Sequence, residues 1–347
     1  MTKSKHHSFF RGSFFIATVG MLLATTTSSF SIARDAESDL EETTYDLRIA
    51  AGEPGKGFSN MLRDINKVCG SEVRLQDVKT DGSFTNISLL ANNQADIGMA
   101  TIDILGNLKQ TDENIAALQV VFPLNLNLLH VVAKAGGTEA RYIRKGESKF
   151  GGLMKADDVV EVRKEVITKF SDLKGKKVVL VGSARITGPL LERALGYGMK
   201  FSDADIDEDA IKQVLENKAH AYITISGYPN GKLSALKSNS GLSMVPYDLS
   251  ANPPYVVIRK NYVNMGVVNN PFLAVPSVLL TRPYKTGGDL GRKVVALQSC
   301  MNRNLDRLKE GGPSWKPAPQ PGWAEVKNTS ESYGWPLYNA GATKVKK

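Results

Sequence analysis

The residues between Thr80 and Asp103 carry the pattern that most directly suggests binding chemistry. Thr80-Asp81-Gly82-Ser83 has the composition of a strand end followed by a small-residue turn, and a short helix is predicted directly after it. The first N–H groups of a helix have no partner inside the helix, so such a turn attracts anions. A second short strand and a polar loop follow at 95–103. The stretch therefore predicts an anion-binding turn beside the ends of two strands.

A similar arrangement recurs in the second half of the chain, without a close sequence repeat. The glycine-containing loop 182–189 lies between a predicted strand at 176–181 and a predicted helix at 190–195. Pro189 suits the first helical turn, with Thr187 or Gly188 as the cap and Gly196 as the end. A further strand at 219–225 ends in the polar loop Ser226-Gly227-Tyr228-Pro229.

We expect a ligand to lie between two lobes, at the carboxyl ends of the strands, where open α/β sheets bind ligands. The candidate contacts are small residues at helix starts, polar loop side chains and two aromatic rings, namely Gly57, Phe58, Gly82, Ser83, Asn86, Asp103, Ser183, Arg185, Thr187 and Tyr228. Arg185 is the leading candidate, because a guanidinium binds a carboxylate through two parallel hydrogen bonds. Asp103 could pair with an ammonium group. If both side chains face the cleft, the ligand is predicted to be an amino acid.

Each of these residues also has a structural interpretation. Arg185 can be a solvated loop arginine, and Asp103 can cap a helix over 104–110. Ser83 can likewise serve only as a helix cap. Phe58 lies on the apolar face of a helix, which favours the core, so Tyr228 is the better contact candidate of the two rings.

Residues typical of catalysis are scarce. Beyond residue 33 the chain holds two histidines, His130 and His220, and each lies in or beside an apolar strand pattern that favours a packed side chain. The chain has no Gly-x-Ser-x-Gly elbow, Walker loop or His-x-x-x-His pair. The acidic cluster at 203–209 lacks the ordered spacing of a calcium loop. We expect no enzyme activity, no cofactor and no metal.

The hydrophobic pattern predicts the elements that position these loops. The expected strands are 45–51, 73–78, 97–100, 118–122, 128–133, 255–259 and 272–281, and the expected helices are 58–69, 83–93, 207–217 and 290–308. Strands that alternate with helices predict a largely parallel sheet with covering helices.

Three other segments also carry expectations. Residues 135–156 have no clear period and are predicted to be a loop, whereas the spacing of Val159, Val162, Val166 and Phe170 predicts a helix over 157–170 packed on a core. Two segments near 128–134 and 244–250 are predicted to form a hinge. The chain after Gly311 is rich in Pro, Gly and Trp and is predicted to wrap the surface.

The first 33 residues are predicted to be a cleaved export signal. Three basic residues precede an apolar run at 14–24, which is well short of a bilayer span, and Ser31-Ile32-Ala33 fits cleavage after Ala33. An uncleaved anchor is the alternative. Cleavage removes three positive charges and no acid, so the formal net charge falls from +9 to +6. The basic residues form no stripe interleaved with aromatics, so no nucleic acid partner is predicted. We expect a soluble periplasmic protein.

The two cysteines, Cys69 and Cys300, each lie on or beside the apolar face of a predicted helix. An exported protein can hold a disulfide, but two buried thiols fit the pattern equally well, because spacing alone does not decide pairing. A bridge would require the C-terminal helix to pack on the N-terminal lobe.

Several motifs together resemble a known family. Thr80-Asp81-Gly82-Ser83-x-x-Asn86 is followed by Ala95-Asp96-Ile97, Asp172-Leu173-Lys174-Gly175 leads into Gly182-Ser183, and Ala219-His220-Ala221-Tyr222 precedes the 226–229 loop. Over roughly 45–310 this order resembles the TAXI-type solute receptors of TRAP transporters. The chain looks like a divergent member, because its first glycine-rich loop, its 136–170 segment and its end after Gly311 depart from the family pattern.

The resemblance implies a type II periplasmic binding fold: α/β, two-lobed, with mostly parallel central sheets, flanking helices and a hinge. We assign 45–130 and 246–347 to lobe I and 131–245 to lobe II. The resemblance also implies a small organic acid or amino acid as ligand and membrane permease subunits as partners. The alternatives are a secreted sensor that docks on a membrane partner without transport, a receptor for another small anion, and a secreted enzyme on the same fold.

Overall fold

The computed structural model describes residues 46–146, 148–149, 154–155, 157–285 and 287–311, together with Trp315 and Tyr338. The predicted export signal and its cleavage after Ala33 lie outside these residues. Within the described part of the chain, no helix has the length and apolar character needed to cross a membrane.

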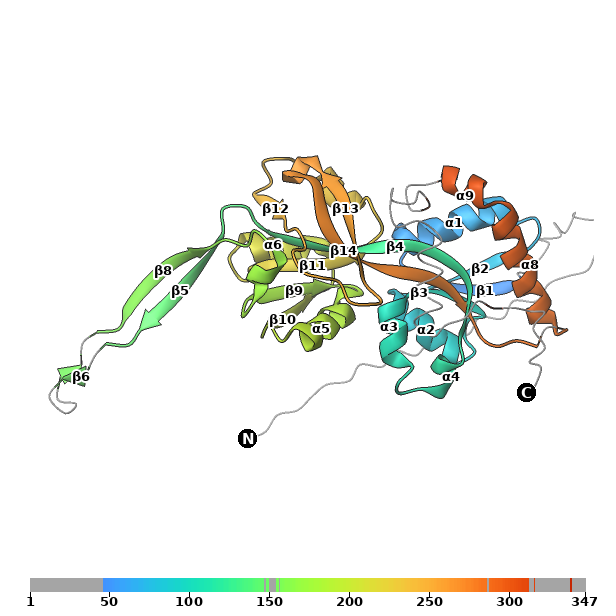
Figure 1. The fold of residues 1–347 in the computed structure, drawn as a ribbon, viewed down its shortest axis with the longest axis horizontal. Helices are drawn as coiled ribbons and strands as arrows, with labels where there is room; N and C mark the ends of the chain where they lie inside the picture. Colours follow the sequence, from blue (N-terminus) through green and yellow to red (C-terminus); the bar gives the residue numbers. More distant parts are fainter. Residues whose placement is uncertain are drawn as a thin grey trace, which may run out of the picture. The chain divides into compact units, whose positions relative to one another are not determined.

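A ten-stranded sheet forms the framework (Figure 1). Eight of its strands follow the order β10-β9-β11-β4-β14-β3-β1-β2, with β12 also on β4 and β13 also on β14. The strands are β1 (Leu47–Gly52), β2 (Leu75–Lys79), β3 (Ile97–Thr101), β4 (Gln119–Lys134), β9 (Lys177–Val181), β10 (Lys200–Ala204), β11 (Ala221–Ser226), β12 (Leu242–Met244), β13 (Val256–Tyr262) and β14 (Val267–Thr281).

The sheet divides into two lobes, each built on three parallel strands. In the first lobe β1 pairs in parallel with β2 and β3, and in the second β9 pairs in parallel with β10 and β11. The long strands β4 and β14 run antiparallel to these groups and pass through both lobes. Separate apolar clusters form the two cores. The predicted two-lobed α/β architecture is confirmed.

The passage between the lobes lies at Asn125 on β4 and Ser277 on β14. The Ser277 hydroxyl accepts from the Asn125 backbone N–H at 3.3 Å and donates to the Asn125 backbone carbonyl at 2.9 Å. The predicted hinge segments 128–134 and 244–250 lie elsewhere, since Leu128–Ala133 pair with β11 and Met244 pairs with Val132 inside the second lobe. Apolar runs mark the strands but do not show where a strand leaves one core for the other.

Part of the chain after residue 245 belongs to the second lobe, not to the first as predicted. Ile258 and Phe272 are buried in one cluster with Tyr222 of the second lobe. Both residues were predicted to lie in the first lobe, as part of 246–347. The chain returns to the first core only along β14, where Leu279 joins the cluster that contains Ile49.

Nine helices flank the sheet in the described residues. They are α1 (Gly57–Cys69), α2 (Ser83–Ala91), α3 (Ile102–Leu108), α4 (Glu113–Ala116), α5 (Ala184–Leu195), α6 (Asp207–Leu215), α7 (Gly231–Ala235), α8 (Asp289–Arg303) and α9 (Leu305–Gly311). Helix α5 ends at Gly196 in the left-handed conformation, as predicted, but it begins at Ala184 and contains Pro189 in its interior. Residues 184–189, which were expected in the loop before this helix, therefore lie within the helix.

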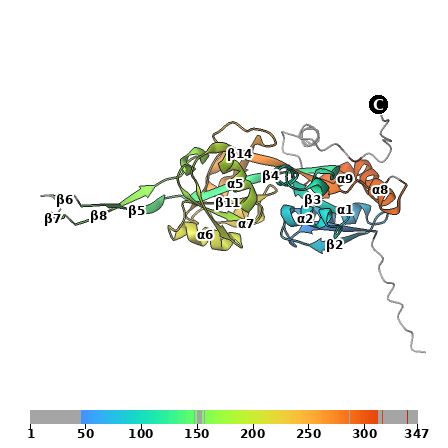
Figure 2. The same cartoon turned by 90° about the horizontal axis from the view of Figure 1, so that it is seen from below.

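The segments 138–144 and 159–165 pair as the two strands of a β-hairpin, where a loop and a helix were predicted. β5 (Thr138–Arg144) and β8 (Val159–Glu165) run side by side in antiparallel register, and β6 (Ser148–Lys149) pairs with β7 (Met154–Lys155) further out (Figure 2). Val159, Val162 and Val166, expected on a buried helix face, are exposed, and of that set Phe170 alone is buried. Valine favours strands, and the pairing partner lies some twenty residues away, beyond any local periodicity.

Two aromatic residues beyond Gly311 are buried in the first core. Trp315 donates from its indole N–H to the Asp64 carboxylate at 3.0 Å, and Tyr338 accepts a hydrogen bond from Gln298 at its backbone carbonyl at 2.9 Å. The expectation that the chain after Gly311 only wraps the surface is wrong at these two described residues.

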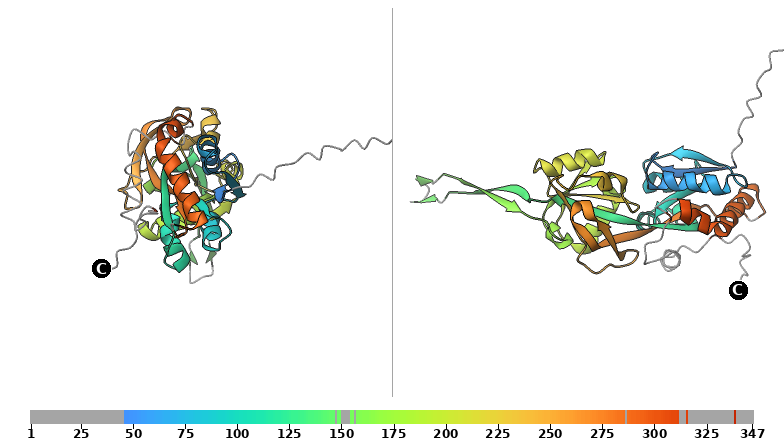
Figure 3. Two further views of the ribbon diagram at one scale, coloured as in Figure 1. Left: turned by 90° about the vertical axis from the view of Figure 1, so that its right-hand side faces the viewer. Right: turned by 90° about the horizontal axis from the view of Figure 1, so that it is seen from above.

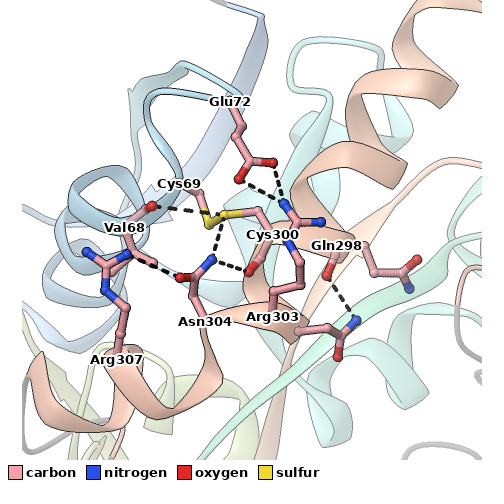
Figure 4. The surroundings of a disulfide bond; sticks show 9 residues. Val68, Cys69, Glu72, Gln298, Cys300, Arg303, Asn304 and Arg307 are labelled. Atoms are coloured by element: carbon pink, nitrogen blue, oxygen red, sulfur yellow. Dashed lines mark hydrogen bonds and ion pairs between the residues drawn. A yellow bond between two sulfur atoms is a disulfide. The ribbon is translucent and has the colours of Figure 1, made fainter.

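The two cysteines form a disulfide. Cys69 ends α1 and Cys300 lies in α8, with the two Cα atoms 5.9 Å apart. Figure 3 shows α8 beside α1, and Figure 4 shows the bridge together with the Glu72–Arg303 ion pair, whose oxygen and nitrogen are 2.6 Å apart. The C-terminal helix therefore packs on the N-terminal lobe, as a bridge requires.

Candidate functional site

A cleft opens where loops of the two lobes meet. The space between its walls is about 650 Å³, which includes open solvent at its mouth. The lining residues are Ala51, Gly52, Glu53, Lys56, Gly57, Phe58, Asp81, Gly82, Ser83 and Thr101 from the first lobe, Asn127 from β4, and Val181, Gly182, Ser183, Thr224, Ile225, Ser226 and Gly227 from the second.

Three helices begin at this cleft. Helices α1, α2 and α5 start there, and their cap residues Lys56, Gly82 and Ser183 make no side-chain capping hydrogen bond. None of the three has an acidic residue in its first turn. Uncapped N–H groups and the positive ends of the helix dipoles favour an anion, by about 0.3–1 kcal/mol per helix end at exposed sites.

Gly82 lets two of these helix starts come close together. Its φ of +133° is one that residues with side chains rarely adopt, and a Cβ at this position would lie 3.2 Å from the Ser183 hydroxyl. A larger residue would both strain the backbone and press on the opposite lobe. The glycine therefore brings the start of α2 against the start of α5.

Thr101 is one of the residues that line the cleft. The residue is only 2% exposed, and its Oγ1 has no hydrogen-bond partner among the described residues. Its backbone N–H donates to the Ser83 hydroxyl at 3.2 Å, which ties the end of β3 to the start of α2. A buried hydroxyl without a partner carries an energetic cost that a bound polar ligand would relieve.

Two carboxylates and one ammonium group also line the cleft. Glu53 lies 3.5 Å from the ammonium group of Lys56, and both side chains are exposed. Asp81 accepts a hydrogen bond from Thr85 in the first turn of α2. These acids could pair with a cationic group on a ligand whose anionic group meets the helix starts.

Five of the ten predicted contacts lie on this lining: Gly57, Phe58, Gly82, Ser83 and Ser183. The other five are not part of it. Asn86 is fully buried, where its amide donates to the Met99 carbonyl at 2.6 Å and its side-chain oxygen accepts from Thr80. Asn86 therefore links α2 to β3 through a hydrogen bond.

A hydrogen bond between Asp103 and Thr187 links the two lobes. The Thr187 hydroxyl donates to the Asp103 carboxylate at 2.5 Å, and the Tyr255 hydroxyl donates to the same oxygen at 3.1 Å. Asp103 and Thr187 are both buried. They connect α3 of the first lobe to α5 of the second, beside the cleft.

Arg185 is turned toward its own lobe. Its guanidinium donates to the Ala204 carbonyl at 2.7 Å and to the Asp205 carboxylate at 2.8 Å. It borders a neighbouring depression that shares Gly82 and Ser183 with the cleft. The early start of α5 places Arg185 on a helical turn, which directs the side chain toward β10.

Tyr228 packs behind the cleft. Its hydroxyl donates to the Asn261 carbonyl at 3.0 Å, its ring meets Tyr262 edge to face, and the Lys260 ammonium lies 4.5 Å from the ring centre. The neighbouring Ser226 and Gly227, from the same predicted loop, line the cleft instead.

Thr101, Asn127, Thr224 and Ser226 line the cleft and were missing from the predicted set. The sequence held a signal for them, since each is a polar residue within or at the end of a largely apolar strand pattern. Buried polar residues in such patterns usually need a partner.

His130 is a buried residue that contacts Ser226, one of the residues that line the cleft. Its Nε2 lies 2.8 Å from the Tyr262 hydroxyl and its Nδ1 lies 3.4 Å from the Ser226 hydroxyl. Burial lowers the pKa of His130 to about 3. The expectation of a packed histidine is confirmed, because the side chain is fully buried.

No protein-family model and no curated protein matches this chain. An ancestral arginine-binding protein bound to arginine is 17% identical, with 76% of this chain and 96% of that chain covered and a TM-score of 0.45. Tv2483 bound to L-arginine is 10% identical, with 85% and 93% covered and a TM-score of 0.45. The periplasmic VFT2 domain of BvgS from Bordetella pertussis is 15% identical, with 76% and 91% covered and a TM-score of 0.42. Similarity at this level identifies no ligand for the chain.

Proposed function

We propose that the protein is an extracytoplasmic receptor that captures a small organic acid or amino acid in the interlobe cleft. The observation that carries the proposal is the meeting of three uncapped helix starts, α1, α2 and α5, in one cleft. A carboxylate on the ligand accepts backbone N–H donors there. Thr101, whose hydroxyl has no hydrogen-bond partner among the described residues, lines the same cleft.

The exposed acids Glu53 and Asp81 extend the proposal to zwitterions. Both line the cleft that the three helix starts share. A ligand ammonium paired with either carboxylate and a ligand carboxylate at the helix starts would together fit an α-amino acid. Binding leaves the ligand chemically unchanged in this proposal, and no cofactor takes part.

Delivery of the ligand to a TRAP-type permease is the second part of the proposal. The motif order around 80–103 and 172–229 supports it, as does the basic and apolar start of the chain. The Cys69–Cys300 bridge suits an oxidising compartment such as the periplasm. Uptake of the identified ligand by cells with and without this protein tests that step.

Replacing Ser183 by aspartate tests the binding site. Ser183→Asp puts a fixed carboxylate at the start of α5, where it competes with an anionic ligand and stabilises the helix. Native mass spectrometry of protein purified from cells, followed by denaturation, first identifies any retained molecule by its unmodified mass. Calorimetry with that molecule, or with a panel of common amino acids and dicarboxylates, should then show affinity roughly tenfold or more weaker in the variant.

Ser202→Asp is the matched control, because it adds the same charge on the exposed edge strand β10, away from the cleft lining. It should bind as the unchanged protein does, and neither variant should melt at a lower temperature than that protein. Equal affinity of all three proteins for the retained molecule would contradict the site. An empty protein that binds nothing in the panel would contradict the ligand class.

A further inference from the structure

In the described residues, neither outer edge of the β5–β8 hairpin pairs with another strand. These two strands form a sheet of their own in the described structure. An isolated two-stranded hairpin is marginally stable in water, and three or more strands with an apolar face are needed for independent stability. On β5, the Glu139 N–H donates to the Asn217 side chain of the second lobe at 3.2 Å. On β8, no other described strand pairs with the outer edge.

One face of the hairpin presents exposed apolar side chains, together with Arg141, which lies opposite Val162. Ile143 lies directly opposite Val160, and Val162 follows on the same face. Their exposures are 66%, 58% and 55%. β-branched side chains in adjacent strands stabilise a sheet by packing against one another, so this face gains from added strands.

The other face carries charges in a self-complementary order. Glu161 and Arg163 flank Val162, and both are exposed, with 2.7 Å between their ion-pairing atoms. If two β8 strands pair antiparallel about a two-fold axis at Val162, Glu161 of each copy faces Arg163 of the other. The favourable pair then forms twice, as an isologous contact requires.

We propose that β8 pairs antiparallel with β8 of a second copy of this chain, joining the two hairpins into one four-stranded sheet. Val162 meets its equivalent at the axis, and Val160 lies beside the methylene stem of Lys164 from the other copy. Val166, the first residue after β8, is also exposed, so the chain just beyond the strand is accessible to a second copy. This inference goes beyond ligand binding and does not depend on it.

The paired segment is short. Seven residues span about 24 Å of strand, so the contact belongs with small interfaces and weak association. Sedimentation velocity over a wide concentration range should show a reversible monomer–dimer equilibrium in the micromolar range or weaker.

A pair of charge reversals tests the register. Glu161→Arg alone and Arg163→Glu alone each place like charges opposite one another twice, so each should self-associate roughly tenfold or more weakly than the unchanged protein. An equimolar mixture of the two variants restores both attractive pairs and should dimerise again. Asp203→Arg on the exposed strand β10 makes the same change of charge as Glu161→Arg but lies outside the hairpin, so it is the matched control and should dimerise normally.

Three results would overturn the proposal. They are a monomer at every concentration, variants that associate as the unchanged protein does, and a mixture that stays monomeric. Binding of the monomer to lipid vesicles or to another protein through the hairpin would assign this face to that occupant instead. A thermal melt of each variant shows that the lobes, whose cores the hairpin residues do not join, remain folded.

Discussion

His130 makes the stability of the second lobe sensitive to acid. Its imidazole lies between the Tyr262 and Ser226 hydroxyls, and burial lowers its pKa to about 3, whereas an unfolded histidine has a pKa of about 6.5. The folded state therefore holds it neutral where the unfolded chain binds a proton. Its contribution is fully present above about pH 6.5 and is lost as the pH falls toward 3.

We expect the free energy of unfolding to fall by about 2 kcal/mol between pH 7 and pH 5 from this residue. The pKa of His220 is also lowered by burial, which adds a loss in the same direction. Urea titrations at several pH values measure the slope. The His130→Gln variant keeps a hydrogen-bonding side chain without the titration, so its profile should be flatter. An equal slope in both proteins would contradict the assignment.

Individual residues also show what a sequence does and does not reveal about the site. Gly82 and Ser83 could be predicted because a turn before a helix creates free N–H groups wherever it lies. The side chains of Asn86, Asp103 and Arg185 have the groups needed to bind a ligand, but each makes hydrogen bonds to another part of the protein instead. Chain neighbours do not determine such partners, which come from segments up to 84 residues away.

At the scale of elements, the contact between α3 and α5 fixes the lobes beside the cleft. Thr187 in α5 donates to the buried carboxylate of Asp103 in α3. This link exists because α5 begins at Ala184, six residues earlier than the proline pattern indicates. Proline is best tolerated in a first turn, but Pro189 lies in the helix interior.

Thr187→Val should lower the free energy of unfolding by about 1–3 kcal/mol, because it removes a donor from a buried carboxylate while keeping the side-chain volume. Thr187→Ser retains the hydroxyl and should lose much less. Chemical denaturation of the three proteins makes the comparison. A valine variant as stable as the serine variant would show that the hydrogen bond carries no net stability.

The elements differ in how well their patterns predicted them. The strands β1, β3 and β9 were predicted from short apolar runs, which fit because both faces of these strands are largely buried. The helix α1 was predicted from the one apolar face that it buries. β8 was not predicted as a strand, since both of its faces are exposed and valines at 159, 162 and 166 fit helical spacing by coincidence.

At the scale of the whole molecule, the disulfide joins the beginning and the end of the first lobe. Cys69 and Cys300 are separated by 231 residues, and both are fully buried in the cluster that includes Trp315 and Tyr338. A covalent link between distant segments reduces the freedom of the unfolded chain, and the effect increases with the length of the closed loop.

Removing the bridge should therefore lower the free energy of unfolding by about 2–5 kcal/mol. Urea unfolding with and without a reductant measures the loss. The Cys69→Ser/Cys300→Ser double variant should match the reduced protein and ignore the reductant. Two free thiols counted in the native, oxidised protein would contradict the bridge.

The hairpin divides the chain so that each side keeps one cysteine. A protease cut between β5 and β8 produces an N-terminal fragment with Cys69 and a C-terminal fragment with Cys300. The same cut leaves β4 on one fragment and β14 on the other, still paired along both lobes. The two fragments of the nicked molecule thus stay joined by the disulfide. They separate only when the disulfide is reduced and the protein is unfolded.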